Sequence, residues 1–357
     1  MSSLFSRSAR RASLSHIRRI APVPPGSATG VVVRVYGQME AEFGMLAPPV
    51  ALHAAAPETL AAVWMMLRET LLAGDPADRA AKEAVAAAVS RANACPYCVE
   101  VHGAAFAGVG GDGLSSGVVT GHVDQIDDPW LRELTMWAAA SGHRAAGARR
   151  RAPFEVDRAP SFIGVAMMFH YINRMVTVYL GESPLLPIPR GGHALARRMA
   201  VRIFGHFARV GLPAGLATEL LPAAPAPEDL AWAATGSAMA DALARGFHAV
   251  DRAGTAAIPS QVRAVVATGL DDPDATPPGL LIDDWLAGHL TGVAPADRPL
   301  ARLALLTAWA PHRVTDTDLA DLRAAGLDDA ALIRVTAWSS LAAARRIAVR
   351  LFDDLHR

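Results

Sequence analysis

Several features that mark particular protein classes are scarce in this sequence of 357 residues. It has two cysteines, too few for a disulfide framework, and no run of about 18 apolar residues that could cross a membrane. Its 34 basic and 34 acidic side chains cancel, which argues against nucleic acid or an anionic membrane as a main partner. Apolar residues still make up 52% of the chain, so we expect a large buried core.

The N-terminal segment is basic and rich in serine but does not read as an export signal. Such a signal needs an apolar stretch after Arg18 and Arg19, and the following residues IAPVPPGSATG do not provide one. We therefore predict a flexible basic tail over residues 1–26 on a cytoplasmic protein.

Alternation of β-branched residues, the mark of strands, is almost absent, and VVVRV at 31–35 is the one short exception. Periodicity of 3.6 residues, with proline near starts and glycine near ends, predicts an all-α protein. Helices are expected at about 58–73, 79–93, 95–109, 129–146, 161–180, 193–210, 228–250, 259–268, 279–291, 299–310, 317–325 and 329–353.

The two halves of the chain resemble each other at an offset of about 170 residues. PETL at 57–60 returns as PEDL at 227–230, and the helices at 129–144 and 162–180 have counterparts at 299–313 and 332–351. We predict a tandem duplication. Its first unit would span residues 27–187 and its degenerate second unit residues 227–357. A connecting helix with proline-rich linkers would occupy residues 188–226 between them.

Both cysteines lie in one short segment, KEAVAAAVSRANACPYCVEVHGAAF at 82–106. Cys95 and Cys98 form a Cys-x-x-Cys, and His102 follows one helical turn later. In a helix beginning near Cys95 the three side chains would share a face, close to the dipole end that lowers thiol pKa values. Glu83 lies on the preceding helix, and a turn at 91–94 could fold it over the thiols.

This pattern leaves three alternatives, of which a redox-active dithiol is the one that we favour. A zinc site would need a fourth ligand beside Cys95, Cys98 and His102, such as Glu83 or His170, and no second cysteine pair is present. Two inert buried cysteines are the third alternative. We expect no metal and no cofactor.

Glu-x11-Cys-x2-Cys-x3-His resembles the signature of the alkylhydroperoxidase AhpD-like branch of the carboxymuconolactone decarboxylase family, with Glu83, Cys95, Cys98 and His102 at the family's spacings. FHYINR at 169–174 resembles the family's last helix, and residues 312–335 resemble its C-terminal region. The resemblance implies an all-helical AhpD-like fold with thiol peroxidase, or peroxiredoxin-type, activity.

The resemblance also implies the roles of the four residues. Cys98 would attack the peroxide, Cys95 would resolve the sulfenic acid as a disulfide, and Glu83 with His102 would relay the proton. A lipoyl protein, a thioredoxin or a small thiol would then act as electron donor, and a homo-oligomer is possible. The chain departs from the best-studied members, because Pro96 and Tyr97 replace a histidine between the cysteines. In the second half, Arg263 falls near the Glu83 position and no cysteine follows.

Two other functions remain open: an enzyme like the carboxymuconolactone decarboxylases, which lack the cysteine pair, or a non-catalytic helical interaction protein. Several further residues are weaker candidates. His170 and Asn173 could line a pocket or form a buried polar network. Trp64, Met65 and Met66 are expected in the core, His143 and His312 at helix ends, and the aspartates at 271–274 and 283–284 in a solvated loop.

Overall fold

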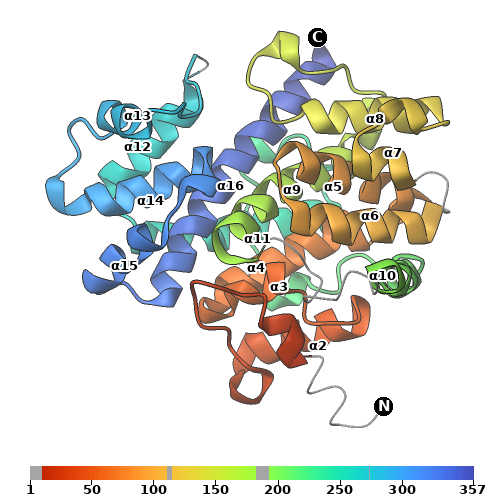
Figure 1. Ribbon diagram of the computed structural model, residues 1–357, viewed down its shortest axis with the longest axis horizontal. Coiled ribbons are helices and arrows are strands. Elements are labelled where there is room, and N and C mark those ends of the chain that lie inside the picture. Colours follow the sequence, from red (N-terminus) through yellow and green to blue (C-terminus); the bar gives the residue numbers. More distant parts are fainter. Residues whose placement is uncertain (1–9, 111–114, 182–192, 273) are drawn as a thin grey trace.

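The computed structural model describes residues 10–110, 115–181, 193–272 and 274–357, and these ranges are predominantly helical (Figure 1). No β-strand forms in the described part, where two isolated bridges join Ile17 to Leu180 and Ala73 to Leu212. The all-α prediction is confirmed. The helices are α2 (Gly30–Glu42), α3 (Pro48–Ala51), α4 (Pro57–Leu67), α5 (Arg79–Ala92), α6 (Pro96–Gly110), α7 (Ser115–Thr120), α8 (Pro129–Ala140), α9 (Ala159–Tyr179), α10 (His193–Ala208), α11 (Ala238–Ala257), α12 (Ser260–Asp271), α13 (Ile282–His289), α14 (Arg298–Trp309), α15 (Asp316–Ala324) and α16 (Asp329–Asp353).

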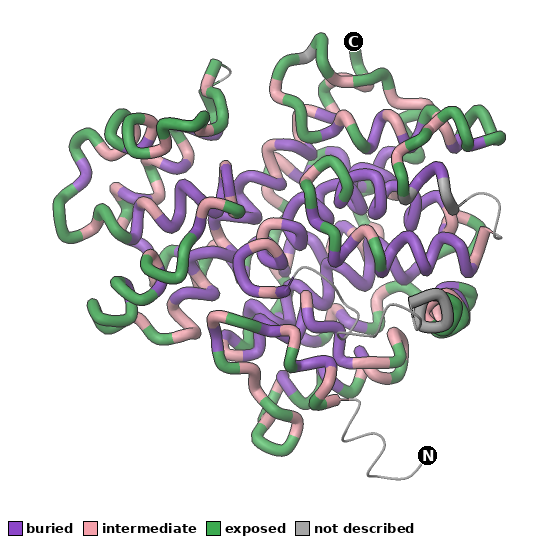
Figure 2. The backbone as a smooth tube through the Cα atoms, in the orientation of Figure 1, coloured by how far each residue is buried: buried purple, intermediate pink, exposed green. Residues whose placement is uncertain are grey.

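Four helices form the centre of the molecule, where most residues are buried (Figure 2). The two longest, α9 and α16, pack against each other, and α4 packs against α11. Each of these pairs joins the first half of the chain to the second. α9 is apolar on almost every side, as expected for a helix surrounded by other helices.

The remaining helices lie on the two sides of this centre, with α5 to α8 on one side and α12 to α15 on the other (Figure 1). The packing is alike on both sides, because α5 contacts α8 and α9 while α12 contacts α14 and α16. This correspondence agrees with the expected duplication, which itself stays a prediction, as do the domain boundaries.

Some local predictions were wrong. VVVRV at 31–35 lies in α2, where Val32 and Val35 face the core, so helical burial overrides its β preference. The helix expected at 228–250 begins at Ala238, where Ser237 caps it by accepting a hydrogen bond from the Ala240 N–H. The helix expected to reach residue 146 ends at Ala140. The helix expected at 58–73 is confirmed, as α4 followed by a π-helical turn, Arg68–Leu72.

Part of the predicted N-terminal tail is packed against the protein. Residues 1–9 lie outside the described residues, but Leu14, Ile17 and Ile20 are buried. Arg10 forms an ion pair with Glu40, and Arg19 forms one with Asp316 of the second half. Residues 10–26 therefore contact both halves of the chain and do not form a flexible tail.

Candidate functional site

The two cysteines lie where the chain turns from α5 into α6. Ala94 adopts a left-handed conformation with φ of 51°, and the Cys95 N–H donates to the Ser90 carbonyl at 2.9 Å. Pro96 then begins α6, a position that suits proline because its missing N–H needs no partner there. This tight turn places Cys95 at the helix start and Cys98 in its first turn, as the sequence predicted.

The carboxylate and the imidazole of the motif form a direct contact. Glu83 Oε2 lies 2.7 Å from His102 Nδ1, and its other oxygen accepts a hydrogen bond from Arg79 Nε at 2.8 Å. Burial would raise the pKa of Glu83, but Arg79 and His102 outweigh it and hold the pKa below its ordinary value. Because an ionised carboxylate only accepts hydrogen bonds, the neutral form of His102 carries its proton on Nδ1, and its Nε2 is then an acceptor.

The two thiols are buried, unbridged and hydrogen-bonded to each other. The contact with Cys98 lowers the pKa of Cys95 despite burial, and a hydrogen bond from Asn173 adds to this. Burial and the neighbouring Cys95 sulfur raise the pKa of Cys98 well above its ordinary value. Cys95 is therefore the more acidic thiol of the pair and Cys98 the less acidic one.

A polar network supports the thiols from the side of α9. Asn173 donates to Ser90 Oγ at 3.1 Å and accepts from Asn93 at 2.9 Å. His170 contacts Asn93 through Nδ1 and Ser141 through Nε2. His170 and Asn173 thus belong to a buried network, and neither lines the cavity described next. Sequence reasoning missed Ser90, Asn93 and Ser141, which carry no motif.

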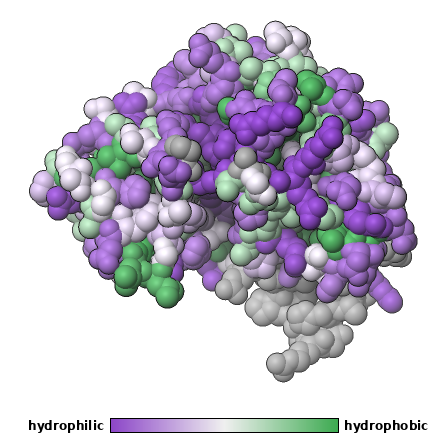
Figure 3. All heavy atoms as spheres, turned by 90° about the horizontal axis from the view of Figure 1, so that it is seen from above, coloured by the Kyte–Doolittle hydropathy of each residue, from purple (hydrophilic) through white to green (hydrophobic). Residues whose placement is uncertain are grey.

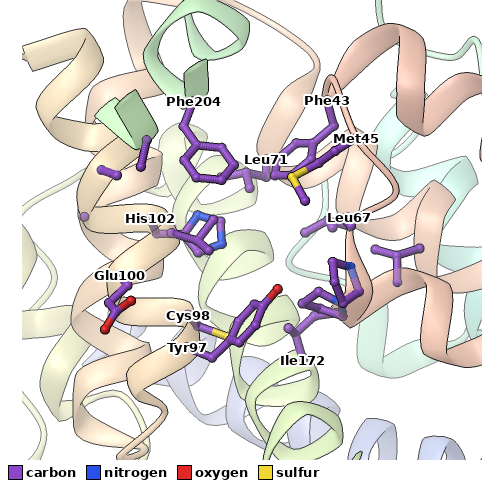
Figure 4. Close-up of a pocket in the computed structure, with 18 of the residues that line it drawn as sticks. Phe43, Met45, Leu67, Leu71, Tyr97, Cys98, Glu100, His102, Ile172 and Phe204 are labelled. Atoms are coloured by element: carbon purple, nitrogen blue, oxygen red, sulfur yellow. The ribbon is translucent and has the colours of Figure 1, made fainter. Parts of the chain in front are cut away.

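Cys98 and His102 open onto an apolar cavity of about 630 Å³. In Figure 4, Phe43 and Phe204 lie across this cavity from Cys98 and Tyr97, with His102 between them. Cys95 and Glu83 do not line it. Among the described residues no arginine or lysine contributes to the wall, so the cavity favours an uncharged, apolar guest.

α10 covers one side of the cavity, so the predicted connecting helix is also part of the site. It supplies Met199, Ile203 and Phe204, and the Phe204 ring lies 6.0 Å from that of Phe43. α10 crosses α6 very closely, since a Cβ on Gly108 would fall 2.3 Å from the Cα of Gly205. No signal in the sequence indicated this crossing, because the two glycines are 97 positions apart.

The residues that were weaker candidates for a functional role lie in the cavity wall, in the core or in ion pairs. Trp64 lines the cavity, whereas Met65 and Met66 are core residues. Asp271 pairs with Arg346, and Asp283 with Arg302. In the described ranges, no group of three or more histidine, cysteine or acidic side chains is placed to hold a metal ion. Nor does any described helix have the length and apolar character needed to span a membrane.

Comparison with known proteins identifies the class. The sequence model of the Carboxymuconolactone decarboxylase family matches residues 58–112, which include Glu83, both cysteines and His102. The chain belongs to this family and to its AhpD-like branch.

A full-length relative supports this membership. The chain is 37% identical over 337 residues to a Mycobacterium tuberculosis protein named Alkyl hydroperoxide reductase Rv2159c, and the alignment covers 94% of each chain. No solved structure matches the chain.

Proposed function

We propose that this protein is a dithiol peroxidase that reduces organic hydroperoxides. One observation carries the proposal: the thiol of Cys98 and the imidazole of His102 share one apolar cavity, while their respective partners, Cys95 and Glu83, lie outside its wall. This arrangement exposes one thiol and one base to a substrate and keeps a second thiol within reach of the first. The name of the mycobacterial relative supports the same activity.

The reaction has two chemical steps on the protein. Cys98 attacks one oxygen of the hydroperoxide, so that an S–O bond forms, the O–O bond breaks, and the leaving oxygen takes a proton and departs as an alcohol. Cys95 then attacks the sulfenic sulfur of Cys98. The S–S bond forms, and hydroxide leaves with a proton as water. An external dithiol reduces the disulfide and is itself oxidised.

His102 supplies the base that Cys98 needs. Because the Cys98 pKa is raised, this thiol does not ionise by itself near neutrality. Glu83 accepts a hydrogen bond from Nδ1–H of the neutral His102 ring, so Nε2 is the acceptor, and His102 follows Cys98 by one turn of α6. The imidazole therefore takes the thiol proton and returns it to the leaving oxygen, while Glu83 stabilises the imidazolium that forms.

The cavity favours organic hydroperoxides over hydrogen peroxide. Its wall combines the aromatic rings of Phe43, Phe169 and Phe204 with aliphatic side chains, which gain from contact with an alkyl or aryl group. The same wall argues against the decarboxylase alternative, because a substrate with several carboxylates would meet Glu100 and no described arginine or lysine there. The electron donor, the cytoplasmic location and any homo-oligomer stay predictions.

Single cysteine variants test the division of labour. With cumene hydroperoxide and a small dithiol, we expect Cys98→Ser to consume no peroxide. Cys95→Ser should form a sulfenic acid that dimedone traps, without turnover. If Cys95→Ser blocked all oxidation while Cys98→Ser formed the sulfenic acid, the two roles would be reversed. A wild-type protein that consumes no hydroperoxide with any dithiol would overturn the proposal.

A further inference from the structure

Tyr97 brings a hydroxyl group into a cavity wall that is mainly apolar. Its side chain is 3% exposed, belongs to the first turn of α6 and lines the cavity beside Cys98. In Figure 4 the hydroxyl oxygen of Tyr97 points away from α6 into the cavity. Packing does not require this oxygen, because Phe43, Phe169 and Phe204 line the same wall with rings that carry none. The hydroxyl therefore needs another explanation.

The Tyr97 hydroxyl has no hydrogen-bond partner among the described residues. The indole N–H of Trp64, in the same wall, does have one, the side-chain oxygen of Gln38 at 2.7 Å. Nor is the Tyr97 oxygen one of the described buried atoms that are closed to water and left without a partner. It therefore opens into the cavity as a free donor. Buried polar groups in proteins are almost always hydrogen-bonded, so a free one at a cavity indicates a ligand that accepts from it.

The cysteine pair does not use this donor. Among the described residues, the hydrogen bonds to the Cys98 sulfur come from Cys95, Asn173 and Ser90. The hydroxyl nevertheless lies close to the thiols, because burial raises the pKa of Tyr97 well above its ordinary value and the charges of Cys98 and Cys95 raise it further. The phenol therefore keeps its proton near neutrality and stays a donor throughout a reaction at Cys98.

The Tyr97 ring is held in position by its surroundings. It belongs to a helix start and meets the ring of His16 edge-on, with the ring centres 6.0 Å apart. A tyrosine hydroxyl stands at the far end of its ring, so it reaches further from the helix than the thiol of the next residue does. In a hydroperoxide that meets Cys98, the attacked oxygen lies against the sulfur and the alkyl-bearing oxygen lies one bond further out. The hydroxyl is thus suited to the outer oxygen.

We propose that Tyr97 is a catalytic hydrogen-bond donor to the alkyl-bearing oxygen of the hydroperoxide, which is the oxygen that leaves. This inference rests on the peroxidase function proposed above. When Cys98 attacks, the S–O bond forms and the electron pair of the O–O bond passes to the leaving oxygen. The Tyr97 hydroxyl stabilises the charge that develops there and keeps its own proton. His102 gives back the proton that it took from Cys98, and an alcohol departs.

The donor and the wall together define the substrate class, an alkyl or aryl group that carries its peroxide at one end. The organic group contacts the apolar wall while its oxygen accepts from Tyr97. The face of the molecule in Figure 3 is largely hydrophilic, with apolar side chains in small separate groups, so it offers an alkyl group less contact than the cavity does. Hydrogen peroxide lacks the organic group and gains less from this cavity.

Stopped-flow oxidation of the reduced full chain by two peroxides tests the donor. Tyr97→Phe keeps the ring and removes only the hydroxyl. With cumene hydroperoxide, whose leaving alkoxide is strongly basic, we expect the second-order rate constant to fall about tenfold to hundredfold. With perbenzoic acid, whose leaving carboxylate is weakly basic and needs little stabilisation, the fall should stay below about threefold. A general disturbance of α6 would slow both reactions equally.

A matched variant and a binding measurement complete the test. Tyr36→Phe removes a buried hydroxyl outside the cavity, where it donates to the Val23 carbonyl at 2.9 Å, and should leave both rate constants unchanged. Calorimetry of the reduced protein then compares cumyl alcohol, the product, with cumene, which has the same ring and no oxygen. Tyr97→Phe should weaken binding of the alcohol about twofold to tenfold, because one neutral hydrogen bond is lost, and leave the affinity for cumene unchanged.

The outcomes separate this inference from the peroxidase proposal. If the wild type is oxidised and Tyr97→Phe reacts at the same rate, or loses equally with both peroxides, the role of Tyr97 is wrong and the peroxidase proposal stands. Equal affinities of wild type and Tyr97→Phe for cumyl alcohol would likewise overturn the role of Tyr97. A wild type that no hydroperoxide oxidises would instead overturn the peroxidase proposal and, with it, the catalytic role of Tyr97.

Discussion

Glu83→Gln probes the proton relay with almost no change of shape. In the wild type the carboxylate accepts from His102 Nδ1 at 2.7 Å and from Arg79 Nε at 2.8 Å. A glutamine has one acceptor and one NH₂ group. Arg79 can only donate, so it holds the amide oxygen and turns the NH₂ towards His102. Nδ1 of His102 must then become the acceptor, and the ring proton moves to Nε2, where it blocks the base.

The expected loss follows from this change of tautomer. General base catalysis contributes about 10² to 10⁴ in rate, and we expect kcat/KM for cumene hydroperoxide to fall about 10²-fold, equivalent to about 2.7 kcal/mol. The variant should also be less stable by about 3–5 kcal/mol, because Arg79 is 6% exposed and loses its charged partner. The assay is therefore run well below the thermal transition, with circular dichroism as the check on folding.

Two comparisons decide whether the relay is correct. Glu133→Gln makes the same chemical change at an exposed site on α8 and should leave the rate unchanged. His102→Ala should cost about as much as Glu83→Gln, and the double variant should cost little more than either, because the two residues act as one unit. Full additivity in the double variant would refute the relay, as would a folded Glu83→Gln with wild-type kcat/KM.

Three other predictions concern the cavity, the core and the second half. Phe204→Ala removes a ring from the cavity wall, so KM for cumene hydroperoxide should rise about fivefold to tenfold with hydrogen peroxide kinetics unchanged; an equal loss for both peroxides would contradict this. Burial lowers the pKa of His53 to about 4, so the neutral form is favoured on folding. Stability should be complete above about pH 6.5 and fall by roughly 3 kcal/mol as pH drops towards 4, as measured by urea unfolding, and His53→Gln should flatten this profile. Ending the chain after Gly181 exposes the faces of α4 and α9 that α11 and α16 cover, so the fragment should aggregate or self-assemble in size-exclusion chromatography; a monomeric, active fragment would show an independent second half.

The sequence was most informative where the relevant contacts are local. The helix periodicity placed α16 at 329–353, which matches its observed bounds. The spacing of Cys95, Cys98 and His102 predicted that these residues lie close together along the first part of one helix, which is α6. Glu83 could be placed near the thiols because a short turn joins its helix to theirs, whereas its role came from the family resemblance. These are distances that the 3.6-residue repeat and a short turn determine.

Contacts between distant segments could not be read in the same way. The approach of Gly108 to Gly205, the ring of Phe204 over the cavity and the polar link from Asn173 to Ser90 all depend on how whole helices pack. α2 was missed for a related reason, because burial in the core decides its conformation against its β-branched composition.

The most direct test of the peroxidase proposal is the intact mass of the reduced protein before and after one equivalent of cumene hydroperoxide, followed by peptide mapping. We predict a loss of about 2 Da, a single disulfide between Cys95 and Cys98, and release of one equivalent of cumyl alcohol. A dithiol should then restore the original mass. An unchanged mass with intact peroxide, or oxidation of methionines with both cysteines still reduced, would contradict the proposal.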